Sequence, residues 1–239
     1  MQDITHFKEL DSMKSDFVAT VSHDLRSPLT LMRGNVTMFQ MLGELNEQQK
    51  TFLKKIVKGV EDMSHLVNNL LNIGRMESGM GLQPERVNAQ ELVGHVLTTL
   101  QPQATQKNIQ VEHASVTLPP IYLEADRELL TQAITNLVDN SIKYTAIGGK
   151  VKISIQSKPN SVLFVCQDNG IGIAPLDLPH IFEKYYRSGR REAHQERGSG
   201  LGLAIVKSIA ERNGGKMGVE SQLGKGSVFY MEIPLSPKK

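Results

Sequence analysis

The 239-residue chain is poor in the features that mark several protein classes. It has a single cysteine, Cys166, which excludes a disulfide framework and a cysteine-based zinc site and favours a reducing compartment. No apolar run approaches the roughly 20 residues that span a bilayer, and no signal-peptide pattern is seen. The balance of 27 Lys and Arg against 25 Asp and Glu gives no support to nucleic-acid binding. We expect a cytoplasmic, globular portion, whether or not a longer parent chain is anchored in a membrane.

Residues 1–79 have the apolar spacing of long helices. Apolar residues recur every three or four positions, as in Phe17, Val21, Leu25, Leu29, Met32, Val36 and Phe39. After a break at Gly43, Asn46 and Gln49 form a capping pair that predicts a second helix, with the stripe Leu53, Ile56, Val60, Met63, Val67 and Leu70. The pattern predicts an antiparallel hairpin. Because two helices leave one side of each stripe wet, we expect a homodimeric four-helix bundle, although a coiled-coil spacer has the same periodicity.

From about residue 85 the pattern changes to short β-like runs that alternate with helices. Helices are predicted over Gln90–Lys107, Asp126–Tyr144 and Leu201–Arg212. Strands are predicted at Ile109–His113, Ile121–Glu124, Val151–Ser157, Ser161–Gln167, Lys216–Ser221 and Ser227–Ile233. The fold class is therefore α+β, a helical hairpin followed by an α/β sandwich of about 150 residues with its own core.

Two segments of the second half carry clustered glycines. Residues Asp168–Ile173 (Asp-Asn-Gly-Ile-Gly-Ile) follow a predicted strand, and residues Gly198–Leu203 (Gly-Ser-Gly-Leu-Gly-Leu) open a predicted helix. Glycines at a helix N-terminus let backbone N–H groups approach an anion. Neither segment fits a dinucleotide-binding fingerprint or a Walker A loop. Taken singly, each also fits an ordinary tight turn.

The helix predicted from Asp126 has a polar face made of Gln132, Asn136, Asn140 and Lys143. Carboxamide oxygens one turn apart suit a hard cation such as Mg²⁺, and a lysine one turn further can meet phosphate. The ring of Tyr144 could stack on a base. By itself, this face favours an ordinary solvated helix surface over a binding site.

Five motifs in order resemble those of sensor histidine kinases. Phe17–Leu29 resembles the H box, Asn136–Thr145 the N box, Asp168–Gly172 the G1 box, Ile181–Arg187 the F box and Gly198–Leu203 the G2 box. The resemblance covers nearly the whole chain. It implies an incoming helix over residues 1–13, a dimerisation and histidine-phosphotransfer domain over 14–79, and a catalytic ATP-binding domain of the Bergerat fold over 85–236.

The resemblance also implies a site for ATP and Mg²⁺. Asp168 would accept a hydrogen bond from the adenine amino group, Tyr144 would flank the base, and Lys143 would pair with phosphate. Asn140 would ligate Mg²⁺, beside Asn136. The remaining nucleotide-binding positions are glycines that approach the ligand or hinge a lid, with one leucine among them: Gly170, Gly172, Gly198, Gly200, Leu201 and Gly202. Between Arg187 and Gly198 the chain is polar and aperiodic, as expected of such a lid.

By the same resemblance His23 is the nucleophile. A neutral imidazole is nucleophilic near pH 7, and Asp24 would orient the ring and accept its proton. Arg187 would offset charge on the transferring phosphoryl group. The implied partners are a second copy of the chain, a response-regulator receiver whose aspartate takes the phosphoryl group, and a sensor module missing upstream.

Other classes of protein with a similar ATP-binding domain are expected to differ from this chain at particular residues. Bergerat ATPases of the gyrase type use a glutamate at the position of Asn136 to activate water, and an amide cannot act as a general base. A degenerate, scaffolding kinase is expected to lack His23, Asn140, Asp168 or a lid glycine, and none is missing. Serine kinases that share the ATP-binding fold should lack the hairpin. A phosphatase activity is left open by Ser27, four residues after the histidine.

Overall fold

The computed structural model describes residues 25, 27–41, 43–77, 83–114, 119–189 and 199–236. The chain divides into two compact units, residues 1–81 and residues 82–239, and each is described by itself. His23, Asp24 and Gly198 lie outside the described residues, as does most of the segment expected to form a lid. No helix in the described part of the chain combines the length and the apolar character needed to cross a membrane.

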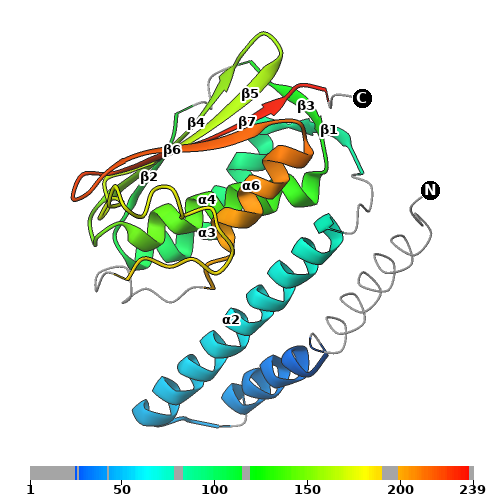
Figure 1. The fold of residues 1–239 in the computed structure, drawn as a ribbon. Coiled ribbons are helices and arrows are strands. Elements are labelled where there is room, and N and C mark those ends of the chain that lie inside the picture. The colour runs from blue at the N-terminus through cyan, green and yellow to red at the C-terminus, as the bar shows by residue number, and fades with distance from the viewer. Residues whose placement is uncertain are drawn as a thin grey trace, which may run out of the picture. The chain divides into compact units, whose positions relative to one another are not determined.

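The first unit contains helical residues 27–41 and the long helix α2 (Glu47–Glu77) (Figure 1). The predicted capping pair is confirmed, because Asn46 Oδ1 accepts the N–H of Gln49 at 2.8 Å and Gln49 Oε1 accepts the N–H of Asn46 at 2.9 Å. Each helix has a pair of buried apolar residues seven apart, Leu29 with Val36 and Leu53 with Val60. Other members of the same stripes are exposed, among them Met32, Phe39, Ile56 and Met63. One chain therefore covers only part of each apolar stripe.

The strands of the second unit form two sheets. Their bounds are β1 (Glu85–Asn88), β2 (Gln110–His113), β3 (Tyr122–Ala125), β4 (Lys150–Ser157), β5 (Ser161–Asp168), β6 (Lys216–Gln222) and β7 (Gly226–Pro234). Strands β1 and β3 pair with each other, and the larger sheet has the order β2-β4-β5-β7-β6. It is mixed, because β2 runs parallel to β4 while its other neighbouring pairs are antiparallel.

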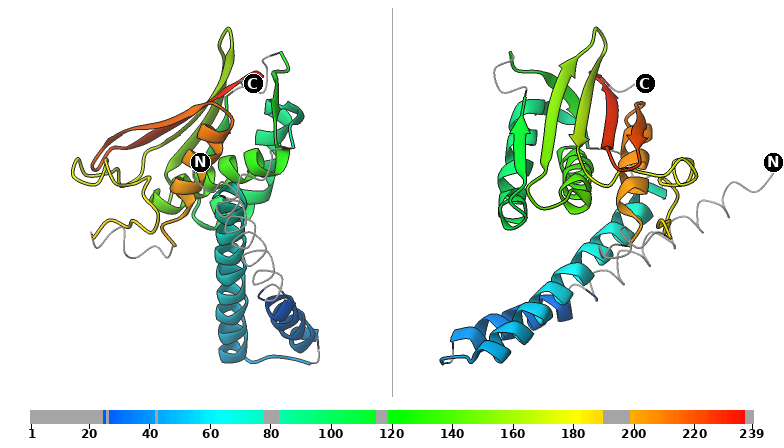
Figure 2. Two further views of the ribbon diagram at one scale, coloured as in Figure 1. Left: turned by 45° about the vertical axis from the view of Figure 1, so that its right-hand side comes forward. Right: turned by 90° about the vertical axis from the view of Figure 1, so that its left-hand side faces the viewer.

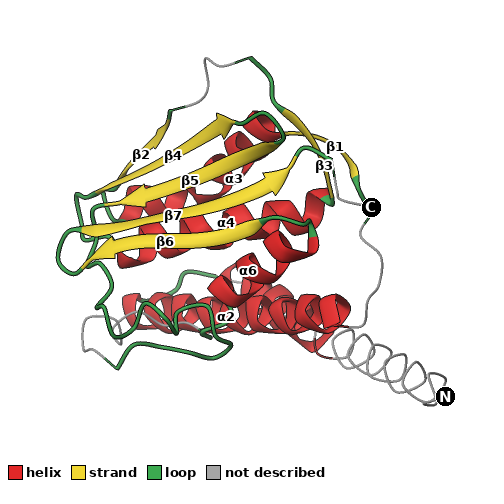
Figure 3. Cartoon of the chain, turned by 45° about the horizontal axis from the view of Figure 1, so that its top comes forward, coloured by secondary structure: helices red, strands yellow, loops and turns green. Residues whose placement is uncertain are grey.

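Three helices pack on one face of the larger sheet: α3 (Ala89–Gln106), α4 (Arg127–Tyr144) and α6 (Gly202–Arg212) (Figure 2 and Figure 3). The starts of α3 and α4 are capped by side chains. Asn88 Oδ1 accepts the N–H of Gln90 at 3.0 Å, and Asp126 Oδ1 accepts the N–H of Leu129 at 3.1 Å. The predicted fold class, a helical region followed by an α/β sandwich, is confirmed.

The alternation of the strands sets the position of Asp168. In β5 the inward residues are Val162, Phe164, Cys166 and Asp168, all buried. Phe164 and Cys166 have apolar neighbours in both β4 and β7, whereas Asp168 lies between Val151 and Ser227. The period of two along the strand thus delivers a carboxylate to the helix-covered face at the end of the sheet.

Candidate functional site

Asp168 ends β5 and is only 7% exposed. Its Oδ1 accepts the backbone N–H groups of Gly170 at 2.9 Å and of Ser227 at 3.2 Å. Ser141 Oγ, from α4, donates to Oδ2 at 3.4 Å. Burial raises the pKa of Asp168, and these three hydrogen bonds act in the opposite direction. Two backbone donors occupy Oδ1, so Oδ2 is the oxygen best placed to accept a further hydrogen bond from a ligand.

Ser141 is a site residue that sequence reasoning missed. Its Oγ lies 3.2 Å from Cys166 Sγ as well as near Asp168. Burial, with a smaller contribution from the Asp168 charge, raises the pKa of Cys166 to about 12, so the thiol keeps its proton. A signal for Ser141 was present in the sequence, because it is a polar residue within the apolar stripe of α4, four residues after Leu137.

The glycines after Asp168 are required by close contacts with the protein's own backbone. A Cβ on Gly170 would lie 2.3 Å from the carbonyl oxygen of Tyr144. Gly172 has a positive φ of 66°, and a Cβ there would lie 2.1 Å from the carbonyl oxygen of Gln222. The segment therefore fits between the end of α4 and the β6–β7 turn only without side chains at these two positions.

The two asparagines of α4 face the start of α6. A Cβ on Gly202, the first residue of α6, would lie 3.6 Å from Asn140 Nδ2 and 3.7 Å from Asn136 Oδ1. The amide nitrogen of Asn136 is buried and has no hydrogen-bond partner in the described part of the chain. No side chain caps α6, whose N-cap residue is Leu201. Backbone N–H groups and an unpaired amide thus converge where an anionic ligand would be stabilised.

Lys143 and Tyr144 end α4, with Lys143 Nζ 5.1 Å from the centroid of the Tyr144 ring. A second cation lies nearby, since Lys107 Nζ donates to the carbonyl oxygen of Lys143 at 2.6 Å. This contact neutralises the partial negative charge at the C-terminus of α4. The carbonyl oxygen of Tyr144 lies against Gly170, so the end of α4 packs on the segment after Asp168.

Arg187 lies on an exposed loop that contacts the second glycine segment. Two residues before it, the N–H of Tyr185 donates to the carbonyl oxygen of Gly200 at 3.0 Å. A Cβ on Gly200 would lie 2.7 Å from the carbonyl carbon of Tyr185, and the φ of Gly200 is 71°. Leu201 follows and is fully buried. Arg187 therefore lies two residues from Tyr185, which contacts Gly200 just before the start of α6.

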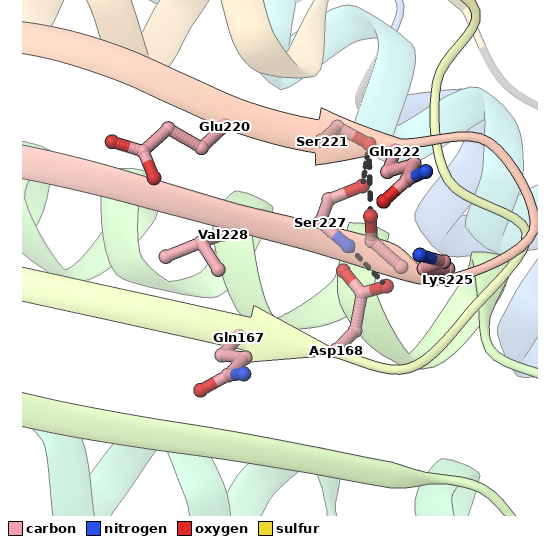
Figure 4. Close-up of a pocket in the computed structure, with 9 residues that line it drawn as sticks. Gln167, Asp168, Glu220, Ser221, Gln222, Lys225, Ser227 and Val228 are labelled. Carbon is pink, nitrogen blue, oxygen red and sulfur yellow. Dashed lines mark hydrogen bonds between the residues drawn. The ribbon is translucent and has the colours of Figure 1, made fainter.

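An open hollow of about 320 Å³ lies beside Asp168 (Figure 4). It is lined by residues of β5, β6, β7 and the β6–β7 turn, including Ser221, Lys225 and Ser227. Of the site residues predicted from the sequence, only Asp168 lines this hollow, and the asparagines of α4 do not. We therefore place the candidate site on the helix-covered side of Asp168, between α4 and α6.

The donor set suits a ligand that brings its own oxygen atoms. In the ranges that the structure describes, no three His, Cys, Asp or Glu side chains are grouped so that they could hold a metal ion. A Mg²⁺ ion in this site would instead use amide oxygen and the oxygens of a phosphate, the ligands it prefers. The amide oxygens of Asn136 and Asn140 suit Mg²⁺, whereas the unpaired Asn136 Nδ2 is an N–H donor that suits a phosphate oxygen.

Two family models match this chain. Residues 13–79 match the His Kinase A (phospho-acceptor) domain. Residues 125–237 match the histidine kinase-, DNA gyrase B- and HSP90-like ATPase. His23 falls within the first match, and the candidate site falls within the second.

Curated relatives match almost all of the chain. Drug sensory protein A of Synechocystis sp. is 34% identical over 245 residues, which cover 98% of this chain and 37% of that protein. Sensor protein SrrB of Staphylococcus aureus is 30% identical over 240 residues, which cover 98% of this chain and 40% of that protein. The chain therefore spans less than half the length of these relatives.

Solved structures of histidine kinases align with most of this chain. Full-length ShkA in complex with AMPPNP aligns with a TM-score of 0.74 and 29% identity, over 93% of this chain and 46% of that one. Histidine kinase ThkA in complex with response regulator protein TrrA aligns with a TM-score of 0.64 and 25% identity, over 97% of this chain and 64% of that one.

Proposed function

This chain belongs to the sensor histidine kinase family, and we propose that it transfers the γ-phosphoryl group of ATP to its own His23. One observation carries the proposal. Asn136, with its unpaired amide, and Asn140 face the uncapped start of α6, in a chain that also matches a phospho-acceptor domain. In this proposal residues 14–79 receive the phosphoryl group, residues 85–236 bind ATP, and residues 1–13 are the incoming helix.

The base of the nucleotide would be held by Asp168. Its carboxylate is fixed by backbone N–H groups at Oδ1, which leaves Oδ2 to accept the adenine amino group. Tyr144 lies against Gly170 and would flank the base. Gly170 and Gly172 keep this wall close to the body of the domain.

The phosphates would lie over the start of α6. In this proposal Gly198, Gly200, Leu201 and Gly202 would offer backbone N–H groups to the phosphates, and Lys143 would add a positive charge from α4. Asn140, beside Asn136, would ligate Mg²⁺, which when bound neutralises phosphate charge. Asn136 would hold phosphate oxygen or water without acting as a base, since a carboxamide does not accept a proton at neutral pH.

In the transfer step, Nε2 of His23 attacks the γ-phosphorus. A P–N bond forms, the bond from the γ-phosphorus to the bridging oxygen breaks, and ADP leaves with that electron pair. Asp24 accepts the proton from Nδ1, so that the ring of the resulting phosphohistidine is neutral and the negative charge stays on the phosphoryl oxygens. Arg187 stabilises the negative charge on the phosphoryl oxygens during transfer.

We propose two protein partners for this reaction. The exposed apolar residues of the hairpin, such as Ile56 and Met63, favour a second copy of the chain that completes a four-helix bundle. The phosphoryl group would then pass to an aspartate of a response-regulator receiver. The ThkA–TrrA complex, in which a related kinase is bound to a response regulator, supports this partner. An upstream sensor module would supply the signal.

Labelling with γ-labelled ATP and Mg²⁺ tests the proposed reaction. The wild-type chain should become labelled in an acid-labile, base-stable form, and His23→Gln should take up no label while still binding nucleotide. The matched control is His95→Gln, which removes an exposed histidine of α3 and should label normally. Full labelling of His23→Gln, or ATP hydrolysis by the wild-type chain without labelled protein, would overturn the proposal.

A further inference from the structure

The carboxylate of Asp177 accepts hydrogen bonds from the hydroxyl groups of the two residues that flank Arg187 in the sequence. Tyr186 Oη donates to Asp177 Oδ1 at 2.8 Å, and Ser188 Oγ donates to Asp177 Oδ2 at 2.7 Å. Both distances are typical of O–H donors to an ionised carboxylate, which are the stronger kind of hydrogen bond. One side chain ten residues upstream thus holds the residues that immediately precede and follow Arg187.

Asp177 is itself fixed by backbone hydrogen bonds. Its N–H donates to the carbonyl oxygen of Ala174 at 2.9 Å, and its own carbonyl oxygen accepts the N–H of His180 at 2.9 Å. Ala174 is buried, and the N–H of the preceding Ile173 donates to Ser221 Oγ at 2.8 Å. The turn that carries Asp177 is therefore anchored to the sheet, directly after the segment that begins at Asp168.

The same loop has a second anchor at Tyr185. This residue has a positive φ of 66°, in the left-handed region that non-glycine residues rarely adopt. Its N–H donates to the carbonyl oxygen of Gly200 at 3.0 Å. Strain of this kind persists only where surrounding contacts enforce it. Gly200 holds the loop on one side of Arg187, and Asp177 holds it on both sides.

We propose that Asp177 is a positioning residue that fixes the direction of Arg187 through the hydroxyls of Tyr186 and Ser188. The inference rests on the proposed function, in which Arg187 stabilises the transferring phosphoryl group. A cation placed before the reaction begins stabilises the transition state without paying for reorganisation. A side chain that is misplaced by about 1 Å can cost as much as 100-fold in rate.

A positioning role and a merely structural role predict different kinetics. If Asp177 acts through Arg187, its loss should lower kcat for autophosphorylation and leave the KM for ATP nearly unchanged, since Asp168 and the asparagines of α4 are untouched. If Asp177 only supports the fold of the loop, its loss should lower the melting temperature. It should also raise the KM for ATP, because the loop directly follows the segment in which Asp168 would hold the base.

The experiment measures autophosphorylation of the full chain as a function of ATP concentration. Asp177→Ala should lower kcat by about 10-fold to 100-fold. A double variant, Tyr186→Phe with Ser188→Ala, removes both donors without changing the carboxylate and should give the same loss. In an Arg187→Ala background Asp177→Ala should cause no further loss, because residues that act as one unit are not additive. Glu211→Gln, which removes an exposed carboxylate of α6, is the control and should leave kcat unchanged.

The outcomes separate this inference from the proposed function. Unchanged kcat in Asp177→Ala and in the double variant, with normal labelling of the wild-type chain, overturns the role of Asp177 alone. So does an equal loss from Asp177→Ala in the presence and in the absence of Arg187. Unchanged kcat in Arg187→Ala also overturns it, although labelling of His23 then stands. Absence of label from the wild-type chain contradicts the proposed function itself.

Discussion

Replacing Asp168 by Asn changes one buried acceptor into a donor at nearly constant shape. The amide oxygen can still accept the N–H groups of Gly170 and Ser227 at the Oδ1 position. The amide nitrogen then takes the Oδ2 position, where it presents N–H groups to the base. The adenine amino group is also a donor, so the two groups face each other without a hydrogen bond.

The expected loss follows from the bond removed. A hydrogen bond to a charged acceptor contributes about 1.5–3 kcal/mol, which corresponds to about a 10-fold to 100-fold rise in the Kd for an ATP analogue. The free energy of unfolding should change by less than about 1 kcal/mol, because removing a buried charge offsets the weaker hydrogen bonds. Guanine carries a carbonyl acceptor at the position of the adenine amino group, so the preference should shift toward a GTP analogue.

Isothermal titration with non-hydrolysable analogues of ATP and GTP measures both effects. Gln167→Glu is the matched control, because this exposed neighbour in β5 points to the opposite face of the sheet. Undiminished ATP binding by Asp168→Asn, with a normal unfolding curve, would refute the assignment of Asp168 to the base. Equal weakening of the ATP and GTP analogues would refute the claim that this carboxylate reads the amino group.

Three further predictions follow from particular contacts. Gly172→Ala should lower the free energy of unfolding by more than about 2 kcal/mol, because φ is positive there and the added Cβ would lie 2.1 Å from a carbonyl oxygen. The control is Gly94→Ala, in open space on α3, which should raise the free energy of unfolding by about 0.5–1 kcal/mol. Thermal or urea melts measure both changes. Hydrogen bonds from Lys158 and Ser161 lower the pKa of Glu232 to about 2. The ionised Glu232 therefore stabilises the fold above pH 4.5, and this contribution is lost as the pH falls toward 2. Glu232→Gln should lower the free energy of unfolding by about 1 kcal/mol at pH 7 and weaken its dependence on pH below 4.5. Ile56→Glu puts a charge in the exposed apolar stripe of α2, so it should convert the proposed dimer to folded monomers. Sedimentation velocity measures this change.

Each of these has a result that contradicts it. Equal stability of Gly172→Ala and the wild-type chain would mean that the segment after Asp168 has room for a side chain. An unchanged acid limb in Glu232→Gln would assign the loss of stability at low pH to other carboxylates. Wild-type sedimentation by Ile56→Glu would exclude this part of α2 from the dimer interface.

Features set by local spacing could be predicted from the sequence. The Asn46–Gln49 cap depends on residues three apart, and both of its hydrogen bonds are present. The strands follow from alternation, and the inward row of β5 ends at Asp168 as a period of two requires. The shared face of Asn136 and Asn140 also depends only on helical spacing, and the structure turns that face toward Gly202.

Features that depend on strand register and loop packing could not be predicted. Ser227 donates to Asp168 because β5 pairs with β7 in one register, over a separation of 59 residues. The contact that requires glycine at position 172 also depends on packing, since a Cβ there would lie 2.1 Å from the carbonyl oxygen of Gln222 at the end of β6. The contacts of Asp177 with Tyr186 and Ser188 lie within a loop that has no periodicity to reveal them.

In the proposed reaction a histidine, rather than water, receives the γ-phosphoryl group. Mass spectrometry at alkaline pH, applied to the chain after a single turnover with ATP and Mg²⁺, locates that group directly. We expect one phosphoryl group per modified chain, on the peptide that contains His23, in step with the release of ADP. Inorganic phosphate released in step with ADP from a chain that stays unmodified, or a phosphoryl group on a serine or threonine, would contradict it.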